Sequence, residues 1–337
     1  MPRVCFLLLA AALAGCPPVS VDDDDSADSG PDDPILDALT ATCGPELTDG
    51  ARTLPVEALD GSFACDMVGC ALALPDSAPT RSYATLRASD TALAVFGWES
   101  DEIIVGRPGG VERLSAPAWS FAVTDESLWV VVDDEIIEVL PGGSVRRACP
   151  LPTGISAEYP VVDVEAGTLL VSGYSEVEER GQLHRATPDG WELLSTGVWP
   201  DRVVHHQGDD LIVLAYGYYE VLSLDTLEVQ QLGGSDDDFS DVVVCDDASY
   251  WVGGMTGLNL YCAANHECSD RLDGFPFQSA STRCNEDRDL EYLLENQGVV
   301  TFHTLTAKNE QREEPAPAGL RHFTSRGDRT WRVVDAD

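Results

Sequence analysis

The sequence predicts an all-β fold built from seven copies of one unit. A turn rich in Asp, Gly, Asn or Glu, followed by a short β-rich run, recurs with successive copies beginning 35 to 44 residues apart. Such regular spacing over most of a chain is typical of a repeat architecture. The copies read ASDTALAVFG from Ala88, VTDESLWVVV from Val123, VDVEAGTLLV from Val162, HQGDDLIVLA from His206, VCDDASYWVG from Val244, CNEDRDLEYLL from Cys284 and TSRGDRTWRVV from Thr324.

Each complete unit contains four short strands. In the second copy, LWVVV is followed by EIIEVL, a Pro-Gly-Gly turn, SVRRACPL and then YPVVDV. Short runs of Val, Ile, Tyr and Trp between turn residues are typical of antiparallel hairpins, and these spacings leave no room for crossover helices. Units of about 40 residues with four strands are typical of propeller blades, so the sequence predicts a seven-bladed β-propeller over residues 54–337.

The two ends of the repeat region predict how the ring closes. The seventh copy contains only two strands before Asp337, so its blade needs strands from elsewhere. GSFACDMVGCALAL from Gly61 matches GLNLYCAANHECSDRL from Gly257 in its order of strand, cysteine, turn, cysteine and strand. We therefore expect residues 54–76 to complete the last blade by pairing with the C-terminal strands, which leaves the ring without open edges.

Two segments carry a family resemblance. FAVTDESLWVVVDDEIIEVLPGG (121–143) and YEVLSLDTLEVQQLGG (219–234) resemble the repeats of bacterial propellers of the NHL, YVTN and quinoprotein-like kinds. The resemblance spans most of residues 54–337 and implies the propeller fold.

The N-terminus resembles that of a bacterial lipoprotein. After Arg3, the apolar run Val4–Ala14 has 11 residues, which is too short to span a bilayer and typical of a signal peptide. Leu13-Ala14-Gly15-Cys16 resembles a lipobox, which implies a signal peptide over residues 1–15 and a diacylglycerol on Cys16. Pro17, in place of an Asp resembling an inner-membrane retention signal, favours the outer membrane.

An acidic tether is expected behind the anchor. Residues 16–34 contain the stretch VSVDDDDSADSGPDDP, whose like charges repel and whose few apolar side chains cannot form a core. Asp22 to Asp25 could also hold a cation, but carboxylates without converging backbone groups are more often solvated spacer. Residues 35–53 are then a linker that leads into the propeller.

The charge of the chain restricts its partners. With 20 basic and 59 acidic residues, the formal net charge is −39. A nucleic acid is excluded because its phosphates are bound through Lys and Arg. The expected partners are a membrane, reached through the lipid anchor, and either an envelope protein or an extracellular ligand, with the chain itself a monomer.

The cysteines predict disulfides. Of ten cysteines, Cys5 lies in the signal peptide and Cys16 carries the lipid, which leaves an even number in an exported chain. Zinc is the alternative, but the spacings lack the paired knuckles of zinc sites. The hairpin match predicts Cys65–Cys70 and Cys262–Cys268. It leaves open the pairing of Cys43, Cys149, Cys245 and Cys284. Of these, Cys245 and Cys284 lie at equivalent turn positions in neighbouring blades.

Two sets of residues are candidates for a binding site at the mouth of the channel. One is an aromatic residue on the approach to each innermost strand, although aromatics also commonly wedge between blades. These residues are Tyr83, Trp119, Tyr159, Trp199, Phe239, Phe277 and Phe323. The other is the acidic run Asp236, Asp237 and Asp238, a candidate Ca²⁺ site that lacks the spaced carboxylates of an EF-hand and can equally be solvated charge. No cofactor is firmly assigned.

No sequence motif indicates catalysis. The chain has no nucleophile elbow, no HExxH, no P-loop and no dinucleotide fingerprint. We therefore expect a surface-tethered, non-catalytic binding or scaffold lipoprotein of the bacterial envelope. The alternative is a propeller hydrolase or lyase that acts on an extracellular glycan or small ester, with carboxylates from separate blades converging on the channel.

Overall fold

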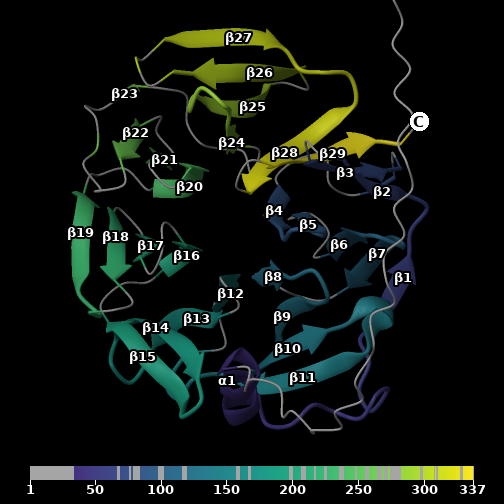
Figure 1. The fold of residues 1–337 in the computed structure, drawn as a ribbon, viewed down its shortest axis with the longest axis vertical. Coiled ribbons are helices and arrows are strands. Elements are labelled where there is room, and N and C mark those ends of the chain that lie inside the picture. Colours follow the sequence, from purple (N-terminus) through teal and green to yellow (C-terminus); the bar gives the residue numbers. More distant parts are fainter. Residues whose placement is uncertain are drawn as a thin grey trace, which may run out of the picture. The chain divides into compact units, whose positions relative to one another are not determined.

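A computed structural model describes residues 34–337 of the chain with short gaps. The gaps are 67–68, 76, 79–83, 98–101, 116–119, 157–159, 166–167, 197–199, 206–209, 216–217, 224–225, 235–238, 247–248, 255–257, 264–267, 269–271, 274–281, 297–298, 307, 309, 327–328 and 337. Within the described residues the chain forms mainly antiparallel β-sheets arranged in turn around a common centre, with very little helix (Figure 1). The fold is an all-β propeller.

Four of the sheets each contain four antiparallel strands, as a single blade does. The first of them comprises β8 (Phe121–Val123), β9 (Leu128–Val132), β10 (Glu135–Val139) and β11 (Val145–Pro150), with the 3-10 turn η1 (Pro141–Gly143) before β11. The second comprises β12 (Val161–Glu165), β13 (Thr168–Ser175), β14 (Arg180–Thr187) and β15 (Gly190–Thr196). The third comprises β16 (Pro200–His205), β17 (Asp210–Ala215), β18 (Tyr218–Ser223) and β19 (Val229–Gly234). The fourth comprises β20 (Phe239–Asp246), β21 (Ser249–Gly254), β22 (Leu258–Ala263) and β23 (Leu272–Asp273).

The other sheets include strands from both ends of the described chain. A five-stranded sheet joins β1 (Val56–Ala58) to β7 (Gly110–Ser115), β6 (Glu102–Arg107), β5 (Leu93–Gly97) and β4 (Ala84–Ala88). An eight-stranded sheet contains a closing group and a neighbouring group, linked through one parallel pair, Thr282 with Thr324. The closing group is β2 (Ser62–Cys65), β3 (Gly69–Leu74), β29 (Arg329–Asp335) and β28 (Leu320–Arg326). The neighbouring group is β24 (Thr282–Cys284), β25 (Leu290–Asn296), β26 (Val299–Leu305) and β27 (Gln311–Pro315).

The closing group unites the two ends of the repeat region. Strand β3 pairs in parallel with β29, and Trp331 lies opposite Cys70 (Figure 1). A side chain at Gly69 would place its Cβ 1.7 Å from the carbonyl oxygen of Thr330, so only glycine allows this close approach. The pairing is the one that the match between the chain ends predicts. Within the stretch 54–76, β2 and β3 join the closing group, whereas β1 pairs with β7.

The hydrophobic core lies between successive sheets. One cluster packs Leu72 and Trp331 of the closing group against Leu86 and Val95 of the five-stranded sheet, and all four side chains are buried. Further clusters join the five-stranded sheet to the β8–β11 sheet and the β8–β11 sheet to the β12–β15 sheet. Strands such as β9 and β10 are therefore apolar at consecutive positions, because both faces of their sheet meet a neighbouring sheet.

Residues 34–58 form an N-terminal strap, which begins with helix α1 (Pro34–Cys43) and ends with β1. The helix packs against β11, β14 and β15. After the helix, the N–H of Leu47 donates to the carbonyl of Arg146 at 2.8 Å, and the N–H of Val145 donates to the carbonyl of Arg52 at 3.0 Å. The strap therefore covers the outer edges of β11 and, through β1, of β7, and so protects two edge strands from other chains. The stretch 35–53, assigned above to a linker, lies within this strap.

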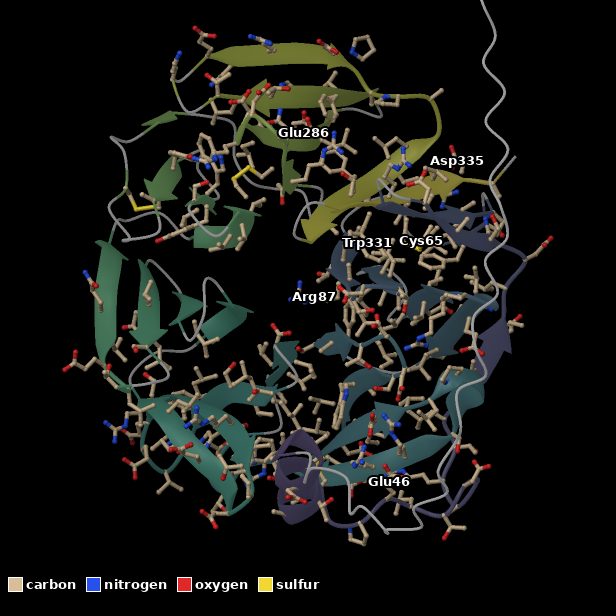
Figure 2. All side chains as sticks on the ribbon, in the orientation of Figure 1. Glu46, Cys65, Arg87, Glu286, Trp331 and Asp335 are labelled. Atoms are coloured by element: carbon tan, nitrogen blue, oxygen red, sulfur yellow. A yellow bond between two sulfur atoms is a disulfide. The ribbon has the colours of Figure 1, made fainter. Side chains whose placement is uncertain are left out.

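A buried ion-pair network fastens the strap to the sheet beneath. Glu138 and Arg147 are 2% and 3% exposed, and Arg147 Nη1 donates to Glu138 at 2.6 Å. Arg147 also pairs at 2.5 Å with Glu46 of the strap, which is labelled in Figure 2, and Arg146 donates a further hydrogen bond to Glu138. Burial opposes ionisation of Glu138, but the bonds from the two arginines outweigh it and hold the pKa of the carboxyl below its usual value.

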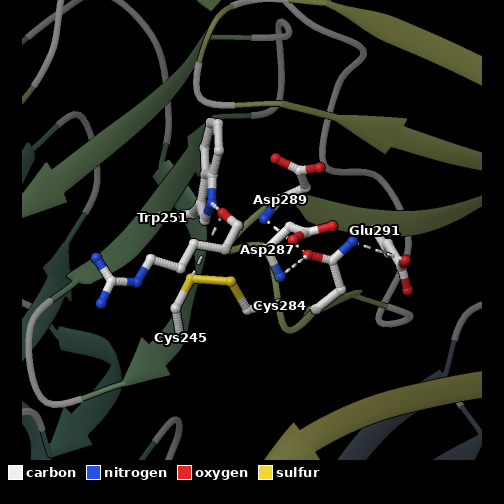
Figure 3. Close-up of a disulfide and its surroundings, with 8 residues drawn as sticks. Cys245, Trp251, Cys284, Asp287, Asp289 and Glu291 are labelled. Carbon is white, nitrogen blue, oxygen red and sulfur yellow. Dashed lines mark hydrogen bonds between the residues drawn. A yellow bond between two sulfur atoms is a disulfide. The ribbon is translucent and has the colours of Figure 1, made fainter.

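Two disulfides connect residues close together in the sequence, and two connect distant segments. The bonded pairs are Cys43–Cys149, Cys65–Cys70, Cys245–Cys284 and Cys262–Cys268. The second and fourth are the pairs that the hairpin match predicts. The third joins β20 to β24 in neighbouring blades, beside a hydrogen bond of 2.9 Å from Trp251 to the carbonyl of Arg288 (Figure 3). Disulfides of this number are typical of a chain that folds outside the reducing cytoplasm.

A buried histidine makes the stability sensitive to acid. His184 on β14 lies opposite Val171, its Nε2 lies 3.1 Å from the side chain of Gln182, and its Nδ1 has no partner among the described residues. Burial lowers the pKa of His184 below its ordinary value. Below pH about 6.5, the unfolded chain therefore takes up a proton that the folded chain resists.

We expect the free energy of unfolding to fall as the pH is lowered from 7.5 to 5.5. For one proton, the free energy of unfolding changes by at most about 1.4 kcal/mol per pH unit. Urea unfolding at both pH values measures it, and a His184→Gln variant should lose less stability over this interval than the wild type. At pH 7.5, where the imidazole is neutral in both states, the comparison reports only the cost of the substitution. An equal pH dependence in the two proteins would contradict this assignment.

Candidate functional site

A cleft lies between the closing group and the neighbouring group. It contains a cavity of about 230 Å³ that is open to solvent on one side. All four strands from β26 to β29 contribute to its walls, together with β24 and the β27–β28 connection. The lining residues are Arg283, Phe302, Glu314, Pro315, Pro317, Leu320, Phe323, Thr330 and Arg332.

The two walls share one pattern, in which a cross-strand pair combines a phenylalanine with a charged residue. Phe302 on β26 lies opposite Glu314 on β27, and Phe323 on β28 lies opposite Arg332 on β29. Residues directly opposite each other in a ladder project from the same face of a sheet. The rings of Phe302 and Phe323 meet with centroids 5.7 Å apart at an interplanar angle of 43°. Glu314 and Arg332 are exposed.

Arg283 on β24 forms the back of the cleft. Its guanidinium carbon lies 5.3 Å from the centroid of the Phe323 ring. Its Nε donates to Glu291 at 2.5 Å, and its Nη1 donates to the hydroxyl of Thr330 at 2.8 Å. Arg283 thus links the neighbouring group to the closing group by a stacked cation and a hydrogen bond, and its charge is balanced within the protein.

A turn behind Arg283 holds this arrangement in place. The side chain of Asn285 accepts hydrogen bonds from the backbone N–H groups of Asp287 and Asp289, both at 2.9 Å. Its amide nitrogen donates to Glu291 at 3.1 Å (Figure 3). The Cys245–Cys284 bridge lies directly before this turn. Glu291 is 8% exposed, so the network that orients Arg283 is shielded from water and well ordered.

The mouth of the cleft presents two opposite charges. Neither Glu314 nor Arg332 forms an ion pair within 4.0 Å with any residue that the structure describes, the other included. Pro315, Pro317 and Leu320 complete the rim with apolar surface. The site therefore combines an aromatic interior, a neutralised arginine at its back and an unpaired acid and base at its opening.

Phe323, a candidate for the rim at the mouth of the channel, lies in the cleft between the closing and neighbouring groups. It is 2% exposed and lines the wall between two groups of strands. Phe239 begins β20, and no side-chain environment is described for it. The other predicted site residues, Tyr83, Trp119, Tyr159, Trp199, Phe277, Asp236, Asp237, Asp238 and Cys16, lie outside the described residues.

The remaining cleft residues carry no motif that would have found them. Phe302 and Arg332 are separated from Arg283 by 19 and 49 residues in the sequence, and each lies in an ordinary alternating strand. The one sequence feature that the cleft residues share is a phenylalanine paired with a charged residue in each of two successive hairpins. It becomes informative only once the register of β26 with β27 and of β28 with β29 is known.

Among the described residues, no group of three or more His, Cys, Asp and Glu side chains is arranged to hold a metal ion. None of the helices in the described part of the chain has the length and apolar character needed to cross a membrane.

Comparison with known proteins shows the fold. No family model matches the chain, and no curated protein is similar to it. A streptogramin B lyase structure is similar with a TM-score of 0.56 at 13% identity, over 82% of this chain and 96% of that one. BamB from Moraxella catarrhalis gives 0.48 at 11% identity, over 84% and 94% of the two chains, and the WD40 propeller domain of Doa1 gives 0.47 at 11% identity, over 80% and 90%. At these identities the likeness shows the propeller fold alone.

Proposed function

We propose that the chain is an exported, lipid-anchored propeller of the bacterial envelope that binds a small extracellular ligand without transforming it. The observation that carries the proposal is the cleft between the closing and neighbouring groups. Its residues offer aromatic surface and charge, whereas the lining contains one carboxylate and no His, Cys, Lys or Ser. Such a set supports recognition better than acid–base catalysis, which needs a positioned proton donor and acceptor.

The proposed architecture has seven blades. The four four-stranded sheets and the five-stranded sheet account for five of them, and the closing and neighbouring groups account for the remaining two. The parallel link between those groups is a single residue pair, which supports the division. On this view the cleft lies between the last two blades, and one of its walls is completed by strands from both ends of the repeat region.

The anchor is testable through Cys16. We expect the wild-type protein to incorporate labelled palmitate and to sediment with membranes, because several acyl chains bind a bilayer strongly. A Cys16→Ser variant should lose the label and appear in the soluble fraction. A Cys5→Ser variant, altered within the signal segment, is the matched control and should keep both properties. Retention of the label by Cys16→Ser would contradict lipidation at this residue.

Ligand binding is testable by equilibrium dialysis of the purified protein against a mixture of small metabolites, read by mass spectrometry. We expect at least one compound to be retained and recovered with its mass unchanged. A Leu320→Trp variant should retain none, because the larger ring fills the mouth of the cavity. Val177→Trp is the matched control, since Val177 is 82% exposed and lies outside the cleft.

Two outcomes contradict the proposal. A product of changed mass would favour the propeller hydrolase or lyase. Equal retention by wild type and by Leu320→Trp would show that binding occurs elsewhere, such as at the mouth of the channel.

A further inference from the structure

The ligand class follows from the mouth of the cleft, and this step rests on the proposed function. Glu314 and Arg332 are both exposed, line the same cavity and belong to opposite walls. An acid and a base on facing walls would ordinarily neutralise each other, but no ion pair joins them. A ligand that carries both charges can therefore contact both walls at once.

The interior of the cavity requires an apolar group on the same ligand. Half-buried Phe302, with Pro315, Pro317 and Leu320, supplies the apolar part of the lining, and the Phe323 ring is buried against Phe302. Arg283 adds no free charge, because its nitrogens already donate to Glu291 and Thr330. Aromatic and alkyl groups gain from burial against such a surface, and flat rings gain further from stacking.

The size of the cavity limits the ligand. Its volume of about 230 Å³ is below the range of roughly 300–1,000 Å³ that is usual for pockets that enclose drug-sized ligands. A molecule with a carboxylate and an ammonium on one carbon, and one apolar side chain, fits both the volume and the charge pattern. A residue inside a peptide has neither charge, and a terminal residue has only one of the two.

We propose that this cleft binds a single apolar α-amino acid as its zwitterion. Arg332 contacts the carboxylate, Glu314 accepts a hydrogen bond from the ammonium, and the side chain enters the space lined by Phe302 and Phe323. Arg283 and Thr330 position the Phe323 ring and do not contact the charges of the ligand.

Isothermal titration calorimetry of the full-length protein with three related compounds tests this assignment. L-phenylalanine carries both charges, N-acetyl-L-phenylalanine lacks the ammonium, and L-phenylalanine amide lacks the carboxylate. We expect L-phenylalanine to bind about two- to fivefold more tightly than either derivative, the range expected for one exposed charge pair. Phe302→Leu should weaken all three, and because Phe302 is only half-buried this variant should fold.

Two charge variants assign each contact. In Glu314→Gln, the preference for L-phenylalanine over its N-acetyl derivative should disappear, while the preference over the amide remains. In Arg332→Gln, the preference for L-phenylalanine over its amide should disappear, while the preference over the N-acetyl derivative remains. Glu313→Gln and Arg312→Gln are the matched controls: both residues are exposed on β27 outside the cleft lining, and neither change should alter the preferences.

Several results would overturn the assignment. Equal affinity for the three compounds, or preferences that persist in both charge variants, would show that the two charges do not recognise the ligand. Failure of L-phenylalanine and L-leucine to bind at millimolar concentration would overturn it as well. If the dialysis experiment still retained another compound in the cleft, the proposed binding function would stand and only the ligand class would be wrong.

Discussion

Replacing Cys43 and Cys149 together with alanine is expected to lower the free energy of unfolding by about 5 kcal/mol. The bond spans 106 residues and joins α1 of the strap to β11, so it restricts the unfolded chain over a long loop. Guanidinium unfolding under oxidising conditions measures the change. We also expect protease cleavage of the strap between α1 and β1 to become faster, because the strap is then held by noncovalent contacts alone, namely packing, hydrogen bonds and the ion pairs of Glu46 and Arg52.

The matched control is the double variant Cys65→Ala and Cys70→Ala. This bond spans five residues within one hairpin, and its loss should cost about 2 kcal/mol. The strap should keep its wild-type resistance to protease in this variant. If the two double variants were equally destabilised, the Cys43–Cys149 bond would contribute no more than a local hairpin bond and the strap would not depend on it.

Trp331→Ala is expected to lower the free energy of unfolding by about 4 kcal/mol, the cost typical of removing a large aromatic residue from a core. Trp331 is fully buried and belongs to the closing group, whose labelled side chains Trp331, Cys65 and Asp335 lie together in Figure 2. It packs in one cluster with Leu72 and Leu86, so its loss opens a cavity between the closing group and the five-stranded sheet. Urea unfolding measures the change.

Trp331→Phe separates packing from hydrogen bonding. The Nε1 of Trp331 has no hydrogen-bond partner among the described residues, so removing its N–H leaves no acceptor unpaired. We therefore expect Trp331→Phe to cost less than half as much as Trp331→Ala. A cost below about 1 kcal/mol for Trp331→Ala would show that pairing of the chain ends adds little to stability.

Much of the fold could be predicted because its signals are local and repeated. A turn residue followed by a β-rich run predicts a hairpin from a few neighbouring residues, and the repetition of similar runs predicts a ring of such units. The two ends of the repeat region could be matched for the same reason, since the cysteine-bearing hairpin near Gly61 has a counterpart near Gly257. The resulting contact of β3 with β29 follows from the need to complete an unfinished blade.

The strap and the cleft could not be predicted, because each depends on which segments meet across the ring. Residues 34–43 form a helix of only ten residues, which is stabilised by packing on β11, β14 and β15 and by the bond from Cys43 to Cys149. The pairing of Cys245 with Cys284 likewise required knowing which neighbouring turns approach each other. Short helices depend on such tertiary packing more than on their own propensity.

The sequence by itself determined the all-β propeller and the two hairpin disulfides, because strand alternation, turn residues and short cysteine spacings act within one unit. Only the tertiary structure decided that Arg283, Phe302, Glu314, Phe323 and Arg332 line one cavity. The reason is that a cleft between blades is made from faces of different units. Their register and spacing are set by packing of the whole ring and leave no periodic trace in any one segment.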